Sequence, residues 1–178
     1  MRIFFALELD TESRKSLREF ARRAGTYAHG RWVREDNYHI TLCFLGEPPP
    51  PLIRRIEAVS LGEGQEAFSY RIGGIGRFRR HRGDILWAGV SDGAEKLAAL
   101  KKFLDDKLEG VGFAPEERPY HPHITLARDV TWEPGGFDRL KESAAPVAGT
   151  ANAITLMESR STAEGVRYIP RKRWTLPR

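Results

Sequence analysis

Apolar and polar residues alternate along this chain with two different periods. Short apolar runs rich in β-branched and aromatic residues predict strands, and they cover residues 3–9, 31–34, 39–45, 68–72, 85–90, 123–126, 153–157 and 167–176. Apolar residues that recur every three to four positions predict helices, which cover residues 11–24, 52–60, 94–108 and 137–143. The order of these elements indicates an α+β protein.

Glycine and proline residues mark the ends of several predicted elements. Gly110 ends the helix over 94–108, in which four leucines form one apolar stripe directed at the core. Three glycines between 73 and 76 are expected to end the strand over 68–72, and a surface loop is expected around His29. Pro48 to Pro51 predict a rigid connection into the next helix, with a proline-rich ligand for a partner domain as the alternative.

The tetrad His-Ile-Thr-Leu occurs twice, at 39–42 and at 123–126, 84 positions apart. Side chains alternate across a strand, so the histidine and threonine of each tetrad share one face while isoleucine and leucine take the core face. If the two strands face each other, two imidazoles and two hydroxyls converge on one volume. A lone histidine in a strand is more often structural, but the identical repeat favours a functional pair.

Two imidazoles can perform general acid–base catalysis near neutral pH. Because an unperturbed imidazole has a pKa of about 6.5, one ring can accept a proton while the other donates one. This division suits displacement at a phosphodiester, where a base activates the nucleophile and an acid protonates the leaving oxygen. The hydroxyls of Thr41 and Thr125 can hydrogen-bond the non-bridging oxygens. These residues alone leave open which of His39 and His123 is the acid.

Several short sequence segments before, around and between the two tetrads also match a known family. They are RIFFALE (2–8), WV (32–33), NYHITL (37–42), FLGE (44–47), LWAGV (86–90), RPY (118–120) and PHITLAR (122–128). With them the chain resembles the two-histidine phosphoesterases, in particular the bacterial and archaeal RNA 2′,3′-cyclic phosphodiesterases, also called 2′-5′ RNA ligases. The resemblance covers nearly the whole chain and shows no departure at a motif position.

This resemblance implies a fold and a role for each matching residue. His39 corresponds to the family's proton donor, His123 to its proton acceptor, and Phe44 to an aromatic residue beside the bound nucleotide. The residues that correspond to phosphate contacts are Thr41, Thr125 and Arg128. The implied fold is one domain over residues 1–178 with two pseudo-symmetric lobes. Each lobe is a mainly antiparallel sheet with helices outside, and the lobes face a central cleft.

Composition and charge narrow the class of protein. A chain of 178 residues with 40% hydrophobic and 30% charged residues is typical of one soluble globular domain. No apolar run approaches the roughly 18 residues of a membrane span, and residues 1–9 are too short for a signal peptide. The single cysteine, Cys43, excludes an internal disulfide and fits the reducing cytoplasm. The net charge of +5 and pI of about 9.6 favour a polyanionic partner.

The densest basic cluster spans residues 77–82 and is followed by the turn dipeptide Gly83-Asp84, which predicts a hairpin with a basic tip. Its arginines could bind RNA phosphates at the rim of the cleft. The alternative is a solvated loop that does not contact RNA. These arginines are Arg77, Arg79, Arg80 and Arg82. His121 and His123 could bind a metal together, but no carboxylate or cysteine stands beside them, so no metal site is expected.

Together these observations predict an enzyme that hydrolyses RNA 2′,3′-cyclic phosphate ends without a metal or other cofactor. By resemblance, the 3′ bond breaks and a 2′-phosphomonoester remains, and weak 2′-5′ ligation is permitted. No Gly-x-x-x-x-Gly-Lys loop is present, so ATP use is not expected. The expected partner of this cytoplasmic monomer is RNA, including tRNA-derived ends, with no obligate protein partner and no membrane. The alternatives are a hydrolase of small cyclic nucleotides and a non-catalytic RNA-end-binding protein.

Overall fold

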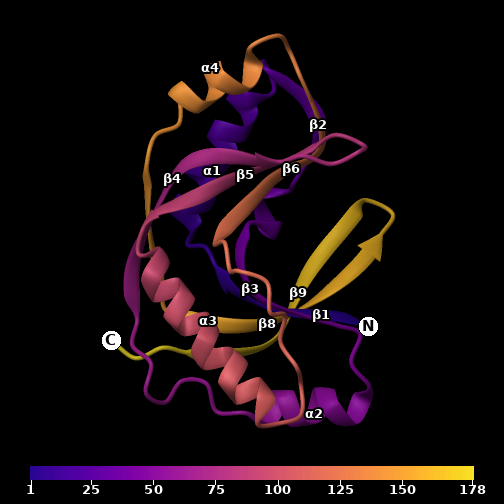
Figure 1. The fold of residues 1–178 in the computed structure, drawn as a ribbon, viewed down its shortest axis with the longest axis vertical. Helices are drawn as coiled ribbons and strands as arrows, with labels where there is room; N and C mark the ends of the chain where they lie inside the picture. Colours follow the sequence, from indigo (N-terminus) through magenta and orange to yellow (C-terminus); the bar gives the residue numbers. More distant parts are fainter.

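Nine strands form two antiparallel sheets in the computed structural model, which describes all 178 residues (Figure 1). The four-stranded sheet has the order β3-β1-β8-β9, with β1 (Arg2–Glu8), β3 (His39–Gly46), β8 (Ala153–Thr162) and β9 (Gly165–Thr175). The five-stranded sheet has the order β2-β6-β5-β4-β7, with β2 (Ala28–Trp32), β4 (Phe68–Phe78), β5 (Asp84–Asp92), β6 (His123–Trp132) and β7 (Val147–Ala151). One tetrad therefore opens β3 and the other opens β6, on different sheets.

Four α-helices pack on these sheets. They are α1 (Thr11–Ala24), α2 (Pro50–Ala58), α3 (Ala94–Glu109) and α4 (Gly136–Glu142), and a short 3₁₀ helix, η1 (Glu35–Asn37), precedes β3. Helices α1 and α4 contact the five-stranded sheet, whereas α3 contacts β3 of the four-stranded sheet (Figure 1). The predicted α+β fold, with two mainly antiparallel sheets and helices packed on them, is confirmed.

Local sequence accounts for where the helices begin and what they bury. The Asp10 side chain accepts a hydrogen bond from the Ser13 N–H at 2.8 Å and so caps α1. Helix α2 begins with two prolines, whose missing N–H groups are not needed in a first turn. The four leucines of the α3 stripe are fully buried, as predicted; they are Leu97, Leu100, Leu104 and Leu108.

Two strand predictions were wrong, and one strand was not predicted. The glycines at 73–76 do not end β4, because the strand absorbs one extra residue between Ile72 and Ile75 and continues to Phe78. The segment around His29 is strand β2 and not a loop, although His29 itself is exposed as expected. Strand β7 was not predicted, since its sequence VAGTA has no apolar alternation strong enough to indicate a strand.

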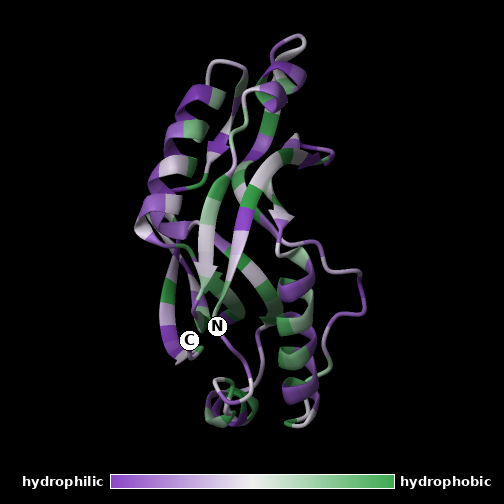
Figure 2. Cartoon of the chain, turned by 90° about the vertical axis from the view of Figure 1, so that its left-hand side faces the viewer, coloured by the Kyte–Doolittle hydropathy of each residue, from purple (hydrophilic) through white to green (hydrophobic).

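The alternation of side chains divides β1 between two apolar clusters. Ile3, Phe5 and Leu7 belong to the main core, which also includes the buried faces of the five-stranded sheet and the helices. On the opposite face, Phe4 and Ala6 form a small cluster with Met157 of β8. Figure 2 shows hydrophobic and hydrophilic residues in alternating bands along the helices, as expected for elements with one buried side. None of the helices has the length and apolar character needed to cross a membrane.

Candidate active site

Each tetrad strand contains an irregularity at the same place. In β3, Thr41 and Cys43 lie opposite the consecutive residues Ala6 and Phe5 of β1, so Leu42 is extra. In β6, residues 125 and 127 lie opposite the consecutive residues 87 and 86 of β5, so residue 126 is extra. The last residue of each tetrad therefore forms a β-bulge, which reverses the alternation of the side chains beyond it.

This reversal brings two more side chains onto the histidine face. A residue five positions after a histidine would point into the core of a regular strand, because five is an odd number. Instead, Cys43 and Ala127 are buried, and the next residues, Phe44 and Arg128, are exposed. Phe44 is 55% exposed, which is unusual for a large apolar side chain. Phe44 and Arg128 therefore occupy equivalent positions in the two lobes, although the sequence halves match only at the tetrads.

The two histidine rings are held in the same way. The Nδ1–H of His39 donates to the carbonyl oxygen of Asn37 at 2.7 Å, and the Nδ1–H of His123 donates to that of His121 at 2.7 Å. A carbonyl only accepts, so these bonds fix the proton on Nδ1 and leave Nε2 available. In His39, Nε2 lies 3.0 Å from the Thr41 hydroxyl, which donates to it while the ring is neutral. This pair confirms that histidine and threonine share one face of β3.

Aromatic side chains surround both rings. The His39 ring lies 5.0 Å from the ring of Phe4 and 5.0 Å from that of Tyr168, which meets it edge-on at 86°. The His123 ring meets Phe78 edge-on at 5.1 Å, lies 5.9 Å from Trp87 and stacks at 5.9 Å on His121. These apolar walls reduce the hydration of both imidazoles.

This desolvation lowers the pKa of both histidines. The pKa of His39 falls to about 4. Burial lowers it most, the bond to the Asn37 carbonyl raises it, and the positive charges of His123 and Arg128 lower it by smaller amounts. Burial also lowers the pKa of His123, with smaller contributions from the charges of His121 and Arg128. Strands β3 and β6 are in contact, so His39, His123 and Arg128 are close enough for their charges to interact.

Arg128 has no ion-pair partner within the protein. The nearest carboxylate in sequence, Asp129, is bound by Arg31, whose Nε lies 2.6 Å from Asp129 Oδ2. Asp129 adopts a left-handed backbone conformation with φ 53°, which is strained for a residue with a side chain. The Arg128 guanidinium therefore stays available for an anion from outside.

The predicted basic hairpin exists, but one of its four arginines has a different environment. Arg79, Arg80 and Arg82 are exposed and make no ion pair. Arg77 instead pairs with Asp84 at 3.2 Å and lies 4.4 Å from the ring of Phe137 of α4. Arg77 is half-buried in this cluster beside α4, so its guanidinium is less accessible than those of the other three, and its assignment as an RNA contact stays a prediction.

Two residues that tie the site to the rest of the chain were not predicted. The buried Asn37 side chain donates to the Val166 carbonyl at 2.7 Å and accepts from the Tyr168 N–H at 3.2 Å, which fixes β9 beside His39. The Tyr120 hydroxyl donates to the Thr41 carbonyl at 3.0 Å and so connects the segment before the second tetrad to the first. The hydrogen-bond partners of Asn37 and Tyr120 are between 79 and 131 positions away in the sequence. The only signal in the sequence for a role of these two residues is that each lies close to a tetrad.

His121 and His123 have no third metal ligand. Their rings stack against each other, and no group of three or more histidine, cysteine, aspartate or glutamate side chains is placed to hold a metal ion. A zinc site needs at least three such protein ligands. Their arrangement therefore favours a role for His123 as an acid–base group over a role as a ligand.

The fold and site together define a class: two-lobed α+β proteins with one His-x-Thr strand in each lobe. The model of the 2′-5′ RNA ligase superfamily matches residues 9–163 of the chain. The chain is 31% identical to an RNA 2′,3′-cyclic phosphodiesterase of Escherichia coli K12, over 98% of this chain and 96% of that protein. It is 30% identical to an RNA 2′,3′-cyclic phosphodiesterase of Thermotoga maritima, over 94% of this chain and 91% of that protein.

Solved structures agree with these sequence relatives. The crystal structure of E. coli LigT in its apo form matches with a TM-score of 0.76 at 29% identity, over 99% of this chain and 98% of that one. The crystal structure of a phosphoesterase matches with a TM-score of 0.78 at 31% identity, over the same shares of the two chains. The chain belongs to the 2′-5′ RNA ligase superfamily, which confirms the resemblance seen in its sequence.

Proposed function

We propose that the protein hydrolyses 2′,3′-cyclic phosphate ends of RNA to 2′-phosphomonoesters, with His39 as proton donor and His123 as proton acceptor. The observation that carries the proposal is the matched orientation of the two rings, each held through Nδ1 by the carbonyl two residues earlier. Nε2 of each neutral ring is therefore the nitrogen that exchanges a proton, and in His39 it accepts a hydrogen bond from the Thr41 hydroxyl in the empty site. The relatives named as RNA 2′,3′-cyclic phosphodiesterases support the choice of substrate.

In the proposed reaction, His123 accepts a proton from water while the water oxygen attacks phosphorus. The bond between phosphorus and the ribose 3′-oxygen breaks, and His39 donates the Nε2 proton to this oxygen. The products are a 2′-phosphate and a 3′-hydroxyl. A ribose 5′-hydroxyl in place of water would give weak 2′-5′ ligation.

Substrate binding would prepare His39 for its role as acid. In the empty site the lowered pKa keeps His39 neutral near pH 7, whereas an acid must carry the proton. The negative charge of a bound phosphodiester favours the imidazolium and raises the pKa of a neighbouring histidine. Thr41, Thr125 and Arg128 would bind the non-bridging oxygens, and Phe44 would stack on the terminal nucleoside.

We further infer that the reaction needs no metal or other cofactor and that the protein acts as a cytoplasmic monomer on RNA ends, tRNA-derived ones among them. The composition of the site supports this inference, since two imidazoles, two hydroxyls and a guanidinium supply a base, an acid and charge stabilisation. Excess chelator should leave turnover unchanged. Loss of activity that Zn²⁺ restores would contradict the inference.

End-product analysis tests the proposed function. A short RNA that ends in a 2′,3′-cyclic phosphate is incubated with the protein in excess chelator, and 2′- and 3′-phosphate products are separated by chromatography. We expect only the 2′-phosphate, formed about 10²–10⁴ times more slowly by His39→Ala or His123→Ala. Turnover of a cyclic mononucleotide but not of the RNA would favour a small-nucleotide hydrolase. Binding without turnover of either, unchanged in the double variant, would favour an RNA-end-binding protein.

A further inference from the structure

We propose that the tip of the β4–β5 hairpin, residues 79–82, binds the single-stranded RNA that leads into the reacting end. The inference rests on the proposed function and adds to it a second binding surface beyond the reacting phosphate. All four side chains of the tip, Arg79, Arg80, His81 and Arg82, are exposed. None of them makes a hydrogen bond or an ion pair with another side chain of the protein.

The tip places three arginines without ion-pair partners within four consecutive residues, whereas many arginines elsewhere are paired with carboxylates. The neighbouring Arg31 is paired with Asp129, and on the other sheet Arg160 and Arg171 both pair with Glu158. The tip therefore concentrates positive charge that nothing within the chain neutralises. Such a concentration attracts a polyanion, because binding releases the counterions condensed on the polyanion.

Both ends of the tip are anchored beside the proposed site. At the β4 end, the Phe78 ring meets the His123 ring edge-on at 5.1 Å. At the β5 end, Gly83 has a φ of 120° and approaches strand β6 so closely that a Cβ there would lie 2.6 Å from the Asp129 carbonyl carbon. Asp129 directly follows Arg128. The tip thus begins next to the strand that carries His123 and Arg128, within reach of an RNA chain that extends from the reacting end.

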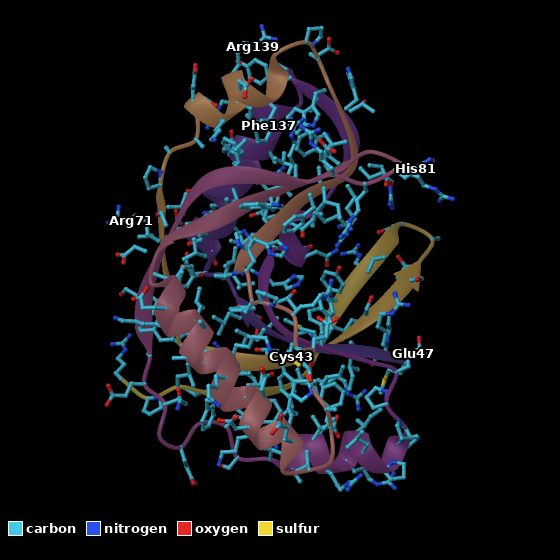
Figure 3. The ribbon with its side chains drawn as sticks, in the orientation of Figure 1. Cys43, Glu47, Arg71, His81, Phe137 and Arg139 are labelled. Carbon is cyan, nitrogen blue, oxygen red and sulfur yellow. The ribbon has the colours of Figure 1, made fainter.

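The hairpin then extends away from the body of the protein. Figure 1 shows its end projecting on the same side of the molecule as the β8–β9 hairpin, and Figure 3 places His81 at that end, on the opposite side of the molecule from Arg71. The tip is therefore accessible to a ligand longer than the reacting nucleotide. A cyclic mononucleotide that occupies the site would not extend to it.

The chemistry of the tip fits single-stranded RNA. A planar guanidinium binds two phosphate oxygens at once, and successive arginines suit a backbone with one charge per nucleotide. The aromatic rings of Phe4, Tyr168, Phe78 and Trp87 around the two histidines suit a terminal nucleotide whose base is unpaired and can stack. The adjoining nucleotides are then flexible enough to follow the hairpin, and flat guanidinium and imidazole groups can stack on their bases.

The test compares two variants with the same loss of charge. One carries Arg79→Gln, Arg80→Gln and Arg82→Gln, and the control carries Arg54→Gln, Arg55→Gln and Arg71→Gln. The control arginines are exposed and unpaired, and they lie on α2 and at the far end of β4. Turnover is measured with a 2′,3′-cyclic mononucleotide and with a ten-nucleotide RNA that ends in the same cyclic nucleotide. Binding of that RNA with a 3′-hydroxyl end is measured by fluorescence anisotropy at several salt concentrations.

We expect the tip variant to lose about tenfold in kcat/KM for the RNA at low salt while kcat/KM for the mononucleotide stays within about twofold. The slope of log Kd against log salt should fall by about 2, since each lost phosphate contact removes about 0.7. The control variant should match the wild-type protein. A third variant, with Arg79→Lys, Arg80→Lys and Arg82→Lys, should keep most of the salt dependence because it keeps the charge.

Three outcomes would overturn the proposal. They are equal kcat/KM of the tip and control variants on the RNA, an equal loss on both substrates, and competition by a polyglutamate peptide as strong as that by an RNA of equal charge. The last result would identify a surface for acidic proteins. If the wild-type protein turns over neither substrate, the proposed function fails, and the anisotropy measurement still decides whether the tip binds RNA.

Discussion

Backbone carbonyls, and not carboxylates, hold both histidines of the site. A carboxylate on Nδ1 would favour the charged imidazolium and raise the pKa of the ring. A carbonyl fixes the tautomer with a weaker effect, so burial dominates and the pKa of His39 falls to about 4. The site is thus arranged to hold two neutral, oriented rings until an anion binds between them.

Loss of either imidazole should remove most of the activity. We expect His39→Ala and His123→Ala each to reduce kcat by about 10²–10⁴, the usual contribution of one general acid or base. The matched control is His29→Ala, because His29 is an exposed histidine that pairs only with Glu133. Steady-state kinetics on an RNA with a cyclic phosphate end measures all three. A loss below threefold at His39 or His123 would contradict the assignment.

The pH dependence should differ between the free protein and the complex. Both histidines have a pKa below the usual 6.5 when the site is empty, so kcat/KM should be bell-shaped with its maximum between about pH 4 and 6.5. Bound phosphate raises both pKa values, so the maximum of kcat should lie at higher pH. Kinetics between pH 4 and 9 checks both. Profiles that are flat from pH 5 to 8, or coincident maxima, would count against a histidine acid–base pair.

At the scale of elements, the paired β-bulges decide which side chains reach the site. The tetrads themselves indicate that His39 and Thr41 share a face, and this expectation was confirmed. Periodicity alone, however, places Phe44 and Arg128 on the core side, and only the resemblance to a family assigned them to the site. A bulge depends on hydrogen bonding to a neighbouring strand, here β1 or β5, that is far away in the sequence. The glycines at 73–76 predicted the end of a strand, but β4 continues through them because its irregular pairing with β5 also depends on residues elsewhere in the chain.

Asn37 should couple the β8–β9 hairpin to His39. In Asn37→Ala, the Val166 carbonyl and the Tyr168 N–H lose their partners, which should reduce the free energy of unfolding by about 1–2 kcal/mol. Tyr168 would then pack less tightly on His39, so water reaches the ring and the pKa of His39 should rise toward 6.5. Denaturant unfolding and NMR titration measure the two effects. Asn152→Ala is the control, because the side chain of this exposed asparagine makes only one hydrogen bond, of 3.4 Å, from Arg173.

An unchanged pKa of His39 in Asn37→Ala, together with the expected loss of stability, would show that Asn37 supports the fold without tuning the histidine. Equal losses of stability in Asn37→Ala and Asn152→Ala would show that the two hydrogen bonds of Asn37 do not fix β9 beside His39.

For the whole molecule, the site depends on how two lobes are held relative to each other. The α+β class and the buried stripe of α3 followed from residue patterns, because each depends on neighbours in the chain. The division of the tetrads between two sheets did not follow from patterns, since β1 pairs with β8 across about 150 residues and β2 pairs with β6 across about 100. One long-range contact, between the Tyr120 hydroxyl and the Thr41 carbonyl, connects the approach to His123 directly with the strand of His39.

Removal of that one hydroxyl should weaken catalysis as well as stability. Tyr120→Phe keeps the ring in place but leaves the Thr41 carbonyl without this donor, which should cost about 1 kcal/mol in the free energy of unfolding. Because the spacing of the two histidines is then less fixed, kcat should fall while KM for a cyclic mononucleotide changes little. Tyr27→Phe is the control, since the half-buried Tyr27 makes no hydroxyl hydrogen bond. A loss of stability with unchanged kcat would show that this bond supports the fold alone, and the relative position of the lobes would then have to be set by packing between β3 and β6.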